Sequence, residues 1–426
     1  MKEYLKRLPG NILELLETAQ ETARGMNYSI YLVGGFARDL ILRVNNFDLD
    51  IAVEGEGIKF AETLAEKLKG KIVSHKRFGT ATVTVKPHLK IDIATTRKEY
   101  YPVPASLPVV SQGSLKDDLF RRDFTINTLA ISLNRENFGQ LMDVFMGKED
   151  ISRGVVRILH DLSFVDDPTR LLRAVRFEQR YNFKIEPDTL KRFKEAVKLK
   201  MLFVVQPQRL RDELILMLKE HEPLKALKRL ENLAGLGFIS PGLKLSKKTE
   251  KFLASVHEEV CWFKAKFDSH RHLDAWLVYF AALMEALDKK EAKAACDRFV
   301  FRKGEESRIL DFFLKRDKFT AKLSKPGLKP SVVFHLLEYL SYEVILLLKA
   351  YAADKNVKEN IEKFFFSYHG TAIHLRGHDL NGLGLSPGPH YQKIFRRVLN
   401  AKLNGEVNNV QEELELVKKI KKVLKI

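Results

Sequence analysis

Cysteine is scarce in this chain, and long hydrophobic runs are missing. Only Cys261 and Cys296 occur among 426 residues, which argues against a disulfide framework and a cysteine-rich zinc site. No stretch of about 18 residues is apolar throughout, so we expect no membrane-spanning helix. The first ten residues are polar and contain Pro9, unlike the apolar core of a signal peptide. These absences favour a cytoplasmic protein without a membrane partner.

Positive charge, by contrast, is in excess. The chain has 73 Lys and Arg against 55 Asp and Glu, a formal net charge of +18. Such a balance favours a polyanionic partner, although a lysine-rich surface that serves solubility would give the same number. With 45% hydrophobic and 30% charged residues, the composition is that of a globular protein. The length suggests two to four domains.

The first third of the chain alternates patterns typical of strands and helices. Helical spacing covers residues 37–43 and 58–69, and short apolar runs predict strands at 29–33, 49–53, 81–85 and 90–94. The last two runs are too close together for a helical crossover between them. We therefore expect a mixed or antiparallel sheet with helices, an α+β head.

Helical spacing dominates the rest of the sequence. The pattern changes near Asp150, and after Pro168 few strand signals remain. We predict an α+β head followed by an all-helical body and tail, divided as follows: 1–150, the head; 151–220, a helical neck; 221–374, a helical body; 375–426, a helical tail.

Two aspartates spaced two apart form the first candidate site. Asp48 and Asp50 lie on a predicted strand, so both side chains point to the same face. Two carboxylates on one face repel each other unless a cation lies between them, and Mg²⁺ binds a few carboxylate oxygens together with substrate phosphates. Asp92, on a later predicted strand, is a third acid for a two-metal phosphoryl transfer.

A glycine turn precedes these acids. Gly34 and Gly35 allow a tight turn into a helix, whose N-terminal N–H groups favour a triphosphate. Arg38, three residues later, is placed to reach the same phosphates. A lone Gly-Gly is usually only a turn and a lone Asp-x-Asp only a strand end, but their order within twenty residues makes the combination specific.

Three ordered motifs resemble those of a known family. Residues 32–39 (LVGGFARD) followed by 46–50 (NFDLD), then 121–127 (RRDFTIN), then 166–177 (DDPTRLLRAVRF), are similar to motifs of the class II tRNA nucleotidyltransferases and bacterial poly(A) polymerases. The resemblance is close over residues 20–215. It implies that residues 1–150 are a nucleotidyltransferase head of the DNA polymerase beta type with catalytic carboxylates, and that the neck 151–220 recognises the nucleotide base. One departure is Asp166, where the family usually has Glu.

The resemblance also implies roles for single residues. Asp48 and Asp50 would bind the catalytic Mg²⁺ ions. The nucleotide would contact Gly34, Gly35, Arg38 and Arg122, with Asp123 and Asn127 near its ribose. Asp167 and Arg170 would read the base edge, and Arg173 and Arg176 would support the triphosphate and the base pocket.

Side-chain chemistry agrees with base reading at residues 167–176. The spacing of three between Asp167, Arg170, Arg173 and Arg176 predicts one helix face. Cytosine and adenine both carry an exocyclic amino donor beside a ring acceptor, which an Asp and an Arg together can match. A surface helix with a ladder of ion pairs is the alternative interpretation.

Three further segments extend the comparison. The Pro- and Tyr-bearing stretch 95–116 is predicted to be either an ordinary surface loop or the family's flexible loop. The stretch 206–213 (QPQRLRDE) is interpreted as structural support for the pocket. In the tail, we expect RNA phosphates to contact Arg396, Arg397, Lys418 and Lys419, although a helix-capping role fits the same segment.

The sequence therefore favours an enzyme that adds CCA, or part of it such as the terminal A, to tRNA 3′ ends from CTP and ATP. A bacterial poly(A) polymerase has the same head and is the alternative. A catalytically silent RNA-binding relative is a second alternative, which the intact Asp48 and Asp50 disfavour. The expected partners are tRNA, CTP and ATP, and no protein partner is implied.

Overall fold

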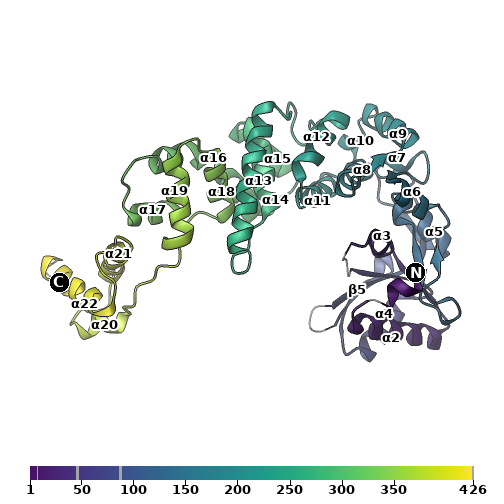
Figure 1. The fold of residues 1–426 in the computed structure, drawn as a ribbon, viewed down its shortest axis with the longest axis horizontal. Helices are drawn as coiled ribbons and strands as arrows, with labels where there is room; N and C mark the ends of the chain where they lie inside the picture. Colours follow the sequence, from purple (N-terminus) through teal and green to yellow (C-terminus); the bar gives the residue numbers. More distant parts are fainter. Residues whose placement is uncertain (7, 45–47, 86–88, 425–426) are drawn as a thin grey trace. The chain divides into compact units, whose positions relative to one another are not determined.

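A computed structural model describes residues 1–424 except 7, 45–47 and 86–88. It divides into two compact units, Met1–Phe238 (unit 1) and Ile239–Ile426 (unit 2). The expected α+β head followed by a helical body is confirmed: strands occur only in unit 1 among the described residues (Figure 1). The finer division into head, neck, body and tail stays a prediction.

The strands and helices of unit 1 have the following bounds. The strands are β1 Ser29–Val33, β2 Leu49–Glu54, β3 Lys71–His75, β4 Thr80–Val85, β5 Leu89–Thr95, β6 Arg97–Tyr100, β7 Val109–Gln112, β8 Ala130–Ser132, β9 Leu141–Met142, β10 Val155–Val156 and β11 Lys184–Ile185. The helices are α1 Lys2–Leu5, α2 Gly10–Met26, α3 Gly35–Leu42, α4 Gly57–Lys67, α5 Leu115–Phe120, α6 Gly147–Arg153, α7 Ser163–Asp166, α8 Thr169–Arg180, α9 Pro187–Lys198, α10 Met201–Val204, α11 Pro207–Leu218 and α12 Pro223–Ala234.

Seven strands form one mixed sheet in the order β3-β4-β5-β2-β1-β8-β9. Only β2 and β5 pair in parallel, and the other neighbours are antiparallel. The prediction of a mixed sheet is thus confirmed. Helices α2 and α4 pack together against the sheet, and α3 packs on β1 and β2 (Figure 1). This arrangement brings the first turn of α3 beside the start of β2.

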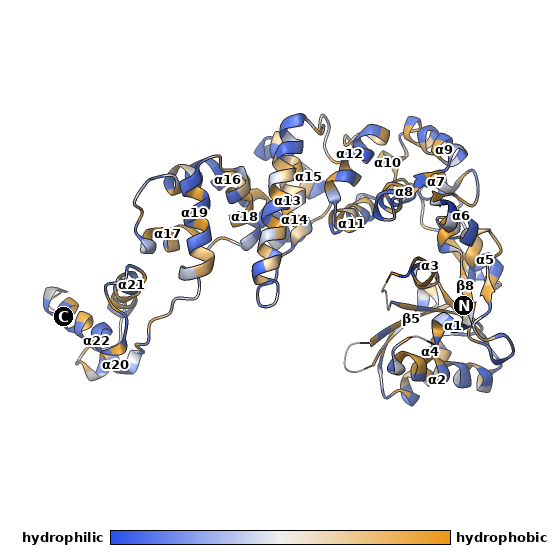
Figure 2. Cartoon of the chain, in the orientation of Figure 1, coloured by the Kyte–Doolittle hydropathy of each residue, from blue (hydrophilic) through white to orange (hydrophobic). Residues whose placement is uncertain are grey.

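Unit 2 is helical throughout its described residues. Its helices are α13 Lys247–Phe267, α14 Ala275–Leu283, α15 Lys289–Arg298, α16 Lys303–Leu323, α17 Pro330–Leu337, α18 Tyr342–Tyr351, α19 Lys355–Lys363, α20 Gly377–Gly382, α21 His390–Leu403 and α22 Val410–Leu424. Most helices carry both hydrophilic and hydrophobic residues along their length (Figure 2). Helices α14 and α18 form the core of unit 2, because eight consecutive residues of each, 276–283 and 343–350, are buried.

The last helices have a small hydrophobic core of their own. It is built from Leu375, Leu380, Leu385, Ile394, Val398, Val417 and Ile420. Glu413 is fully buried beneath it and accepts hydrogen bonds from the His374 backbone N–H (2.9 Å) and the Lys402 ammonium (2.9 Å). These bonds tie the start of the tail segment to α22.

Among the described residues, no single helix combines the length and hydropathy of a membrane span. The helices Pro330–Leu337 and Tyr342–Tyr351 have the length and hydropathy of a span only when they are taken together, and this pair is bent by 116°.

Helix α6 anchors the segment that carries Asn127. The Asp143 carboxylate accepts hydrogen bonds from the first N–H groups of α6, at Gly147 (2.7 Å) and Lys148 (3.0 Å). Further along α6, Asp150 accepts a bond from the Thr125 hydroxyl at 2.6 Å. A Cβ on Gly147 would lie 2.2 Å from the Thr125 carbonyl oxygen, so only glycine allows this close packing.

The substitution Gly147→Ala is expected to destabilise unit 1. The new methyl group must push backbone atoms apart, which costs about 1–3 kcal/mol. We expect the melting temperature to fall by about 5 °C, as measured by circular dichroism. Gly25→Ala in α2 is the control, because a Cβ there has nothing within 4 Å and should leave stability unchanged or raise it. Equal melting temperatures for both variants would contradict the packing argument.

Candidate active site

The carboxylates meet at neighbouring positions of the sheet. Asp50 on β2 and Asp92 on β5 are register partners in the parallel pair, so their side chains leave the sheet on the same face. Asp48 directly precedes β2 and is exposed. The Thr82 hydroxyl donates a hydrogen bond to Asp92 at 2.5 Å and orients it. Residues 46 and 47 of the NFDLD run lie outside the described residues.

Asp50 is the acid most strongly affected by this environment. Burial raises its pKa, Arg122 opposes the rise, and the negative charges of Asp92 and Asp48 add to it, so that the pKa reaches about 6. Clustered carboxylates whose charges repel are the donor set that a hard divalent cation stabilises. No three acidic, His or Cys side chains of the described chain converge closely enough to hold a metal ion by themselves, so substrate phosphates would have to complete such a site.

Gly34 lies between the carboxylate of Asp50 and the guanidinium of Arg122. Its φ of +74° is in the region that favours glycine. A Cβ at this position would lie 3.1 Å from an Asp50 carboxylate oxygen and 3.2 Å from Arg122 Nη1. Any side chain would therefore fill the space between a carboxylate and a guanidinium. Gly35 begins α3 immediately afterwards, as the glycine turn predicts.

The RRDFTIN segment places its polar side chains on one network. Asp123 is buried and accepts hydrogen bonds from the Asn127 amide (2.8 Å) and from Arg173 Nε (2.7 Å). Burial alone would raise the pKa of Asp123, but the Arg173 charge and the Asn127 amide reverse this effect and bring it to about 2. Asp123 is therefore an ionised anchor between this segment and α8.

Helix α8 carries a row of arginines, and one sequence prediction about it is wrong. Arg170, Arg173 and Arg176 lie on α8, but Asp167 precedes the helix in an extended conformation. Pro168 follows Asp167 and disfavours a helical conformation there. The Asp167 carboxylate instead accepts bonds from the Thr169 N–H (3.1 Å) and hydroxyl (2.6 Å).

The arginines of this row are held by protein oxygens. Arg170 donates to the Ser163 hydroxyl (2.6 Å) and to the Arg121 carbonyl (2.8 Å). Glu213 of α11 accepts bonds from Arg173 (2.8 Å) and Arg176 (3.2 Å). From the same helix, Arg209 pairs with Asp167 at 2.8 Å. These contacts agree with the interpretation of residues 206–213 as structural support.

The segment 95–116 is not an irregular loop. Strands β6 and β7 pair as an antiparallel hairpin, which the sequence did not reveal because its exposed strands lack an alternating apolar pattern. Glu99 on β6 accepts hydrogen bonds from Arg121 (3.1 Å) and from the Tyr101 hydroxyl (3.2 Å). Burial raises the pKa of Tyr101 to about 12, so its hydroxyl stays a donor.

These elements enclose a polar cavity of about 440 Å³. It is lined by eleven sequence-predicted residues and by others that the sequence reasoning did not select, namely Glu99, Tyr101, Arg121, Phe177 and Arg180. Seven arginines and four acids line it, so the formal charge favours a polyanionic ligand. The predicted lining residues are Gly34, Gly35, Arg38, Arg122, Asp123, Asn127, Asp167, Arg170, Arg173 and Arg176, together with the catalytic candidate Asp50.

Some predicted residues lie outside this cavity. Asp48 and Asp92 do not line it, although both act electrostatically on Asp50 at its edge. The four predicted RNA contacts belong to unit 2: Arg396 and Arg397 are exposed on α21, and Lys418 and Lys419 are exposed on α22.

Several buried donors of the site lack a protein acceptor. Among the described residues, Arg122 Nε, Arg176 Nε and Arg209 Nη1 are buried without a hydrogen-bond partner. Leaving such a group unpaired costs about 1–3 kcal/mol. All three belong to arginines that line the cavity or hold its wall. The excess of arginines in the lining favours an anionic ligand such as a nucleotide over a neutral molecule.

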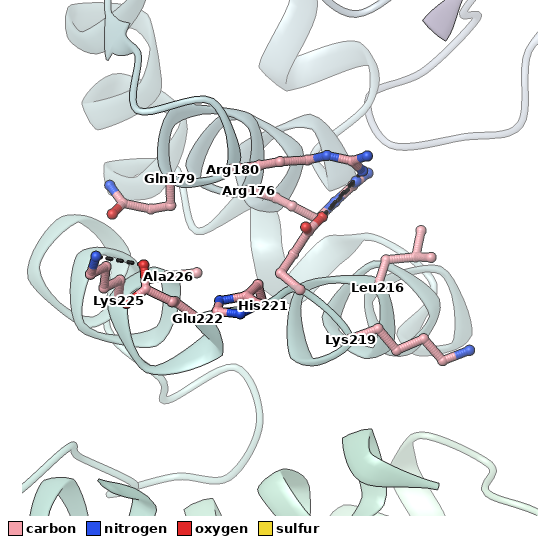
Figure 3. Close-up of a pocket in the computed structure, with 10 residues that line it drawn as sticks. Arg176, Gln179, Arg180, Leu216, Lys219, His221, Glu222, Lys225 and Ala226 are labelled. Atoms are coloured by element: carbon pink, nitrogen blue, oxygen red, sulfur yellow. Dashed lines mark hydrogen bonds and ion pairs between the residues drawn. The ribbon is translucent and has the colours of Figure 1, made fainter. Parts of the chain in front are cut away.

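A second cavity of about 500 Å³ lies between α8, α11 and α12 (Figure 3). Arg176 and Arg180 line both cavities. In the second one, Glu220 lies 3.5 Å from each of these arginines and offsets part of their charge. No glycine of the described chain lines this second cavity, and its two acids, Glu220 and Glu222, pair with the arginines and with Lys225, so the first cavity is the candidate nucleotide site.

Comparison with known proteins agrees with this geometry. Residues 30–157 match the poly A polymerase head domain, and residues 182–246 match a domain described as the probable RNA and SrmB-binding site of polymerase A. The A-adding tRNA nucleotidyltransferase of Halalkalibacterium halodurans is 31% identical over 96% of this chain and 93% of its own length. The chain belongs to the tRNA nucleotidyltransferase and poly(A) polymerase family.

Two other members extend the comparison. The A-adding tRNA nucleotidyltransferase of Geobacter sulfurreducens is 38% identical over 96% of this chain, which spans about half (47%) of that relative's length. The solved Thermotoga maritima CCA-adding enzyme complexed with tRNA-CCA has a TM-score of 0.71 and 32% identity, with 98% of both chains covered. The family resemblance of the sequence motifs is thereby confirmed.

The Asp123–Arg173 pair is expected to be important for stability. Asp123→Asn removes the charge that Arg173 faces and leaves this partly exposed guanidinium with Glu213 as its remaining carboxylate, which costs about 1–3 kcal/mol. We expect a fall in melting temperature of about 5 °C at pH 7. The pKa of Asp123 is lowered from 3.8 to about 2, so the stabilisation is present above pH 3.8 and is lost as the pH falls toward 2.

Calorimetry of the two proteins at several pH values measures this difference. Asp161→Asn is the matched control, because Asp161 also pairs with an arginine, at 2.7 Å, but is 73% exposed; its removal should cost under about 1 kcal/mol. If both variants have the same melting temperature at pH 7, the Asp123–Arg173 pair does not stabilise the protein as expected.

Proposed function

We propose that this chain is a tRNA nucleotidyltransferase that adds the terminal A, or the whole CCA, to tRNA 3′ ends. The observation that carries the proposal is a single cavity that combines a glycine turn, the half-buried Asp50 and the arginine row of α8. Its relatives with 38% and 31% identity are A-adding enzymes, which favours addition of A.

The reaction is the attack of an RNA 3′ hydroxyl on the α-phosphorus of ATP. A new P–O bond forms, and the bond to the leaving diphosphate breaks. Asp48 and Asp50 would hold Mg²⁺, with Asp92 beside them. When bound, the ions supply charge stabilisation for the attacking and leaving oxygens. The clustered acids and the raised pKa of Asp50 support this fit.

The protein's own groups bind and orient the nucleotide. In this proposal the triphosphate lies over the Gly34–Gly35 turn, between Arg38 and Arg122. The ribose lies near Asp123 and Asn127. These groups are fixed before substrate arrives, because each is already held by neighbouring side chains, and such preorganisation lowers the cost of reaching the reactive geometry.

The base is assigned to the other end of the cavity. There Asp167, held by Arg209 at 2.8 Å, would accept a hydrogen bond from an exocyclic amino group, and Arg170 would donate to the adjacent ring nitrogen. Arg173 and Arg176 would support the triphosphate and this pocket. The Tyr101 and Glu99 side chains of the β6–β7 hairpin close the cavity on this side.

Unit 2 is proposed to bind the body of the tRNA. Arg396 lines a groove of about 720 Å³ together with Arg376, Lys393 and the 84% exposed Tyr339. Cations beside an exposed aromatic ring are typical of surfaces that bind RNA phosphates and bases. Arg397, Lys418 and Lys419 extend the basic surface of this unit. A poly(A) polymerase remains the alternative, since its head would be the same.

Three tRNAs separate these activities: one without the CCA end, one that ends in its first C, and one that ends in CC. Each is incubated with Mg²⁺ and labelled CTP or ATP. We expect one AMP to be added to the tRNA that ends in CC. CMP addition to the shorter tRNAs would show a CCA-adding enzyme, and long A tails on unrelated RNA would show a poly(A) polymerase.

Asp50→Asn provides the catalytic control in the same assay. Its amide keeps the shape but not the charge, so incorporation should fall by at least about a thousandfold. The matched variant Asp297→Asn, on α15 of unit 2, should keep full incorporation. A near-normal rate for Asp50→Asn would refute the assignment of Asp50.

A further inference from the structure

A buried hydrogen-bond chain surrounds Arg38. This residue lies on α3 and is 5% exposed. Its Nε donates to Asp39 Oδ1 at 2.8 Å, and its Nη1 donates to the Asn127 side-chain oxygen. A Cβ on Gly35 would lie 3.1 Å from Nη2, so the third nitrogen points toward the glycine turn. Each nitrogen of this guanidinium thus has a separate neighbour.

Tyr181, which directly follows α8, contacts this guanidinium in two ways. Its ring centroid is 4.8 Å from Arg38 Cζ, and the ring of Phe177 lies 5.3 Å away. Its hydroxyl donates to Asp39 Oδ1 at 2.9 Å. Asp39 is fully buried, and a buried carboxylate needs such donors to remain ionised. Tyr181 therefore both stacks on Arg38 and stabilises the acid that orients it.

The chain continues from Arg38 to the proposed ribose position. The Asn127 oxygen accepts from Arg38, and its amide nitrogen donates to Asp123 at 2.8 Å. An Asn amide has one acceptor end and one donor end. With a cation on one side and a carboxylate on the other, only one orientation of this amide satisfies both neighbours.

We propose that Tyr181 is a positioning residue for ribonucleotide selection. Its hydroxyl fixes Asp39, Asp39 fixes the Arg38 guanidinium, and Arg38 fixes the Asn127 amide that faces the sugar. This inference rests on the proposed function, because the sugar position follows from it. Neither residue 181 nor residue 39 needs to touch the nucleotide for the effect.

Tyr181→Phe tests the proposal, because it removes the hydroxyl and keeps the ring over Arg38. We expect the ratio of kcat/KM for ATP to that for dATP to fall about fivefold, since a site loses discrimination when its polar groups are no longer held in place. The KM for ATP should rise about threefold, and kcat should change by less than about twofold.

The matched control is Tyr31→Phe. Tyr31 is another tyrosine of unit 1 whose hydroxyl donates to a carboxylate, that of Glu54, at 3.1 Å. The Tyr31→Phe substitution should leave the ratio of kcat/KM for ATP to that for dATP unchanged. In an Asn127→Ala background, Tyr181→Phe should have no further effect on the ratio, because the two residues act through one path.

Three results would overturn the inference. The first is an unchanged ratio in Tyr181→Phe, even if the melting temperature falls, since this indicates a purely structural role. The second is an equal change in Tyr31→Phe. The third is full additivity with Asn127→Ala. Equilibrium titration of ATP and dATP without RNA compares the two nucleotides independently of transfer. Failure of the proposed function would instead appear as no AMP transfer by the unmodified chain, so the two failures can be told apart.

Discussion

The ion pair between Asp123 and Arg173 connects the two halves of the candidate site. Asp123 follows α5 and belongs to the segment whose Asn127 meets α3, whereas Arg173 lies on α8 and is also held by Glu213. The sheet supplies the acids and the glycine turn, and α8 supplies the arginine row. Without this pair, the Asp123 carboxylate would lose its hydrogen-bonded arginine, and Arg173 would keep only Glu213 as a carboxylate partner.

Charge compensation also explains why the cavity is poised for a nucleotide. Each arginine of the row has a carboxylate or a carbonyl oxygen that holds it in place, yet the lining keeps an excess of positive charge. Buried nitrogens of Arg122 and Arg176 keep N–H groups without a protein acceptor in the described structure. Side chains fixed in this way lose little entropy when an anion binds.

Much of this arrangement could be predicted from the sequence. The strands at 29–33, 49–53, 81–85 and 90–94 follow from apolar runs that are buried in the sheet, and the mixed sheet follows from their spacing. The site residues that belong to the three sequence motifs could be identified because they cluster within short segments. Such clustering reflects local turns and helix faces, which are short-range properties of the chain.

The parts that escaped prediction depend on tertiary contacts. Strands β6 and β7 are exposed and short, and Glu99 and Tyr101 enter the cavity only because the hairpin packs beside Arg121. The sequence prediction placed Asp167 on the helix of Arg170 because the two are three residues apart. Pro168, which lies between them, ends that helical spacing. Tyr181 gave no signal, because its role depends on Asp39, which is 142 positions away in the sequence.

Selection of the nucleotide by the protein itself, without RNA, is the central claim. Titration of ATP, CTP, GTP and UTP into the RNA-free chain, and into Asp167→Ala, tests it most directly. We expect ATP to bind at least about tenfold more tightly than GTP or UTP, and this preference to disappear in the variant because the amino group loses its acceptor. Equal binding of the four nucleotides, or an unchanged preference in Asp167→Ala, would contradict it.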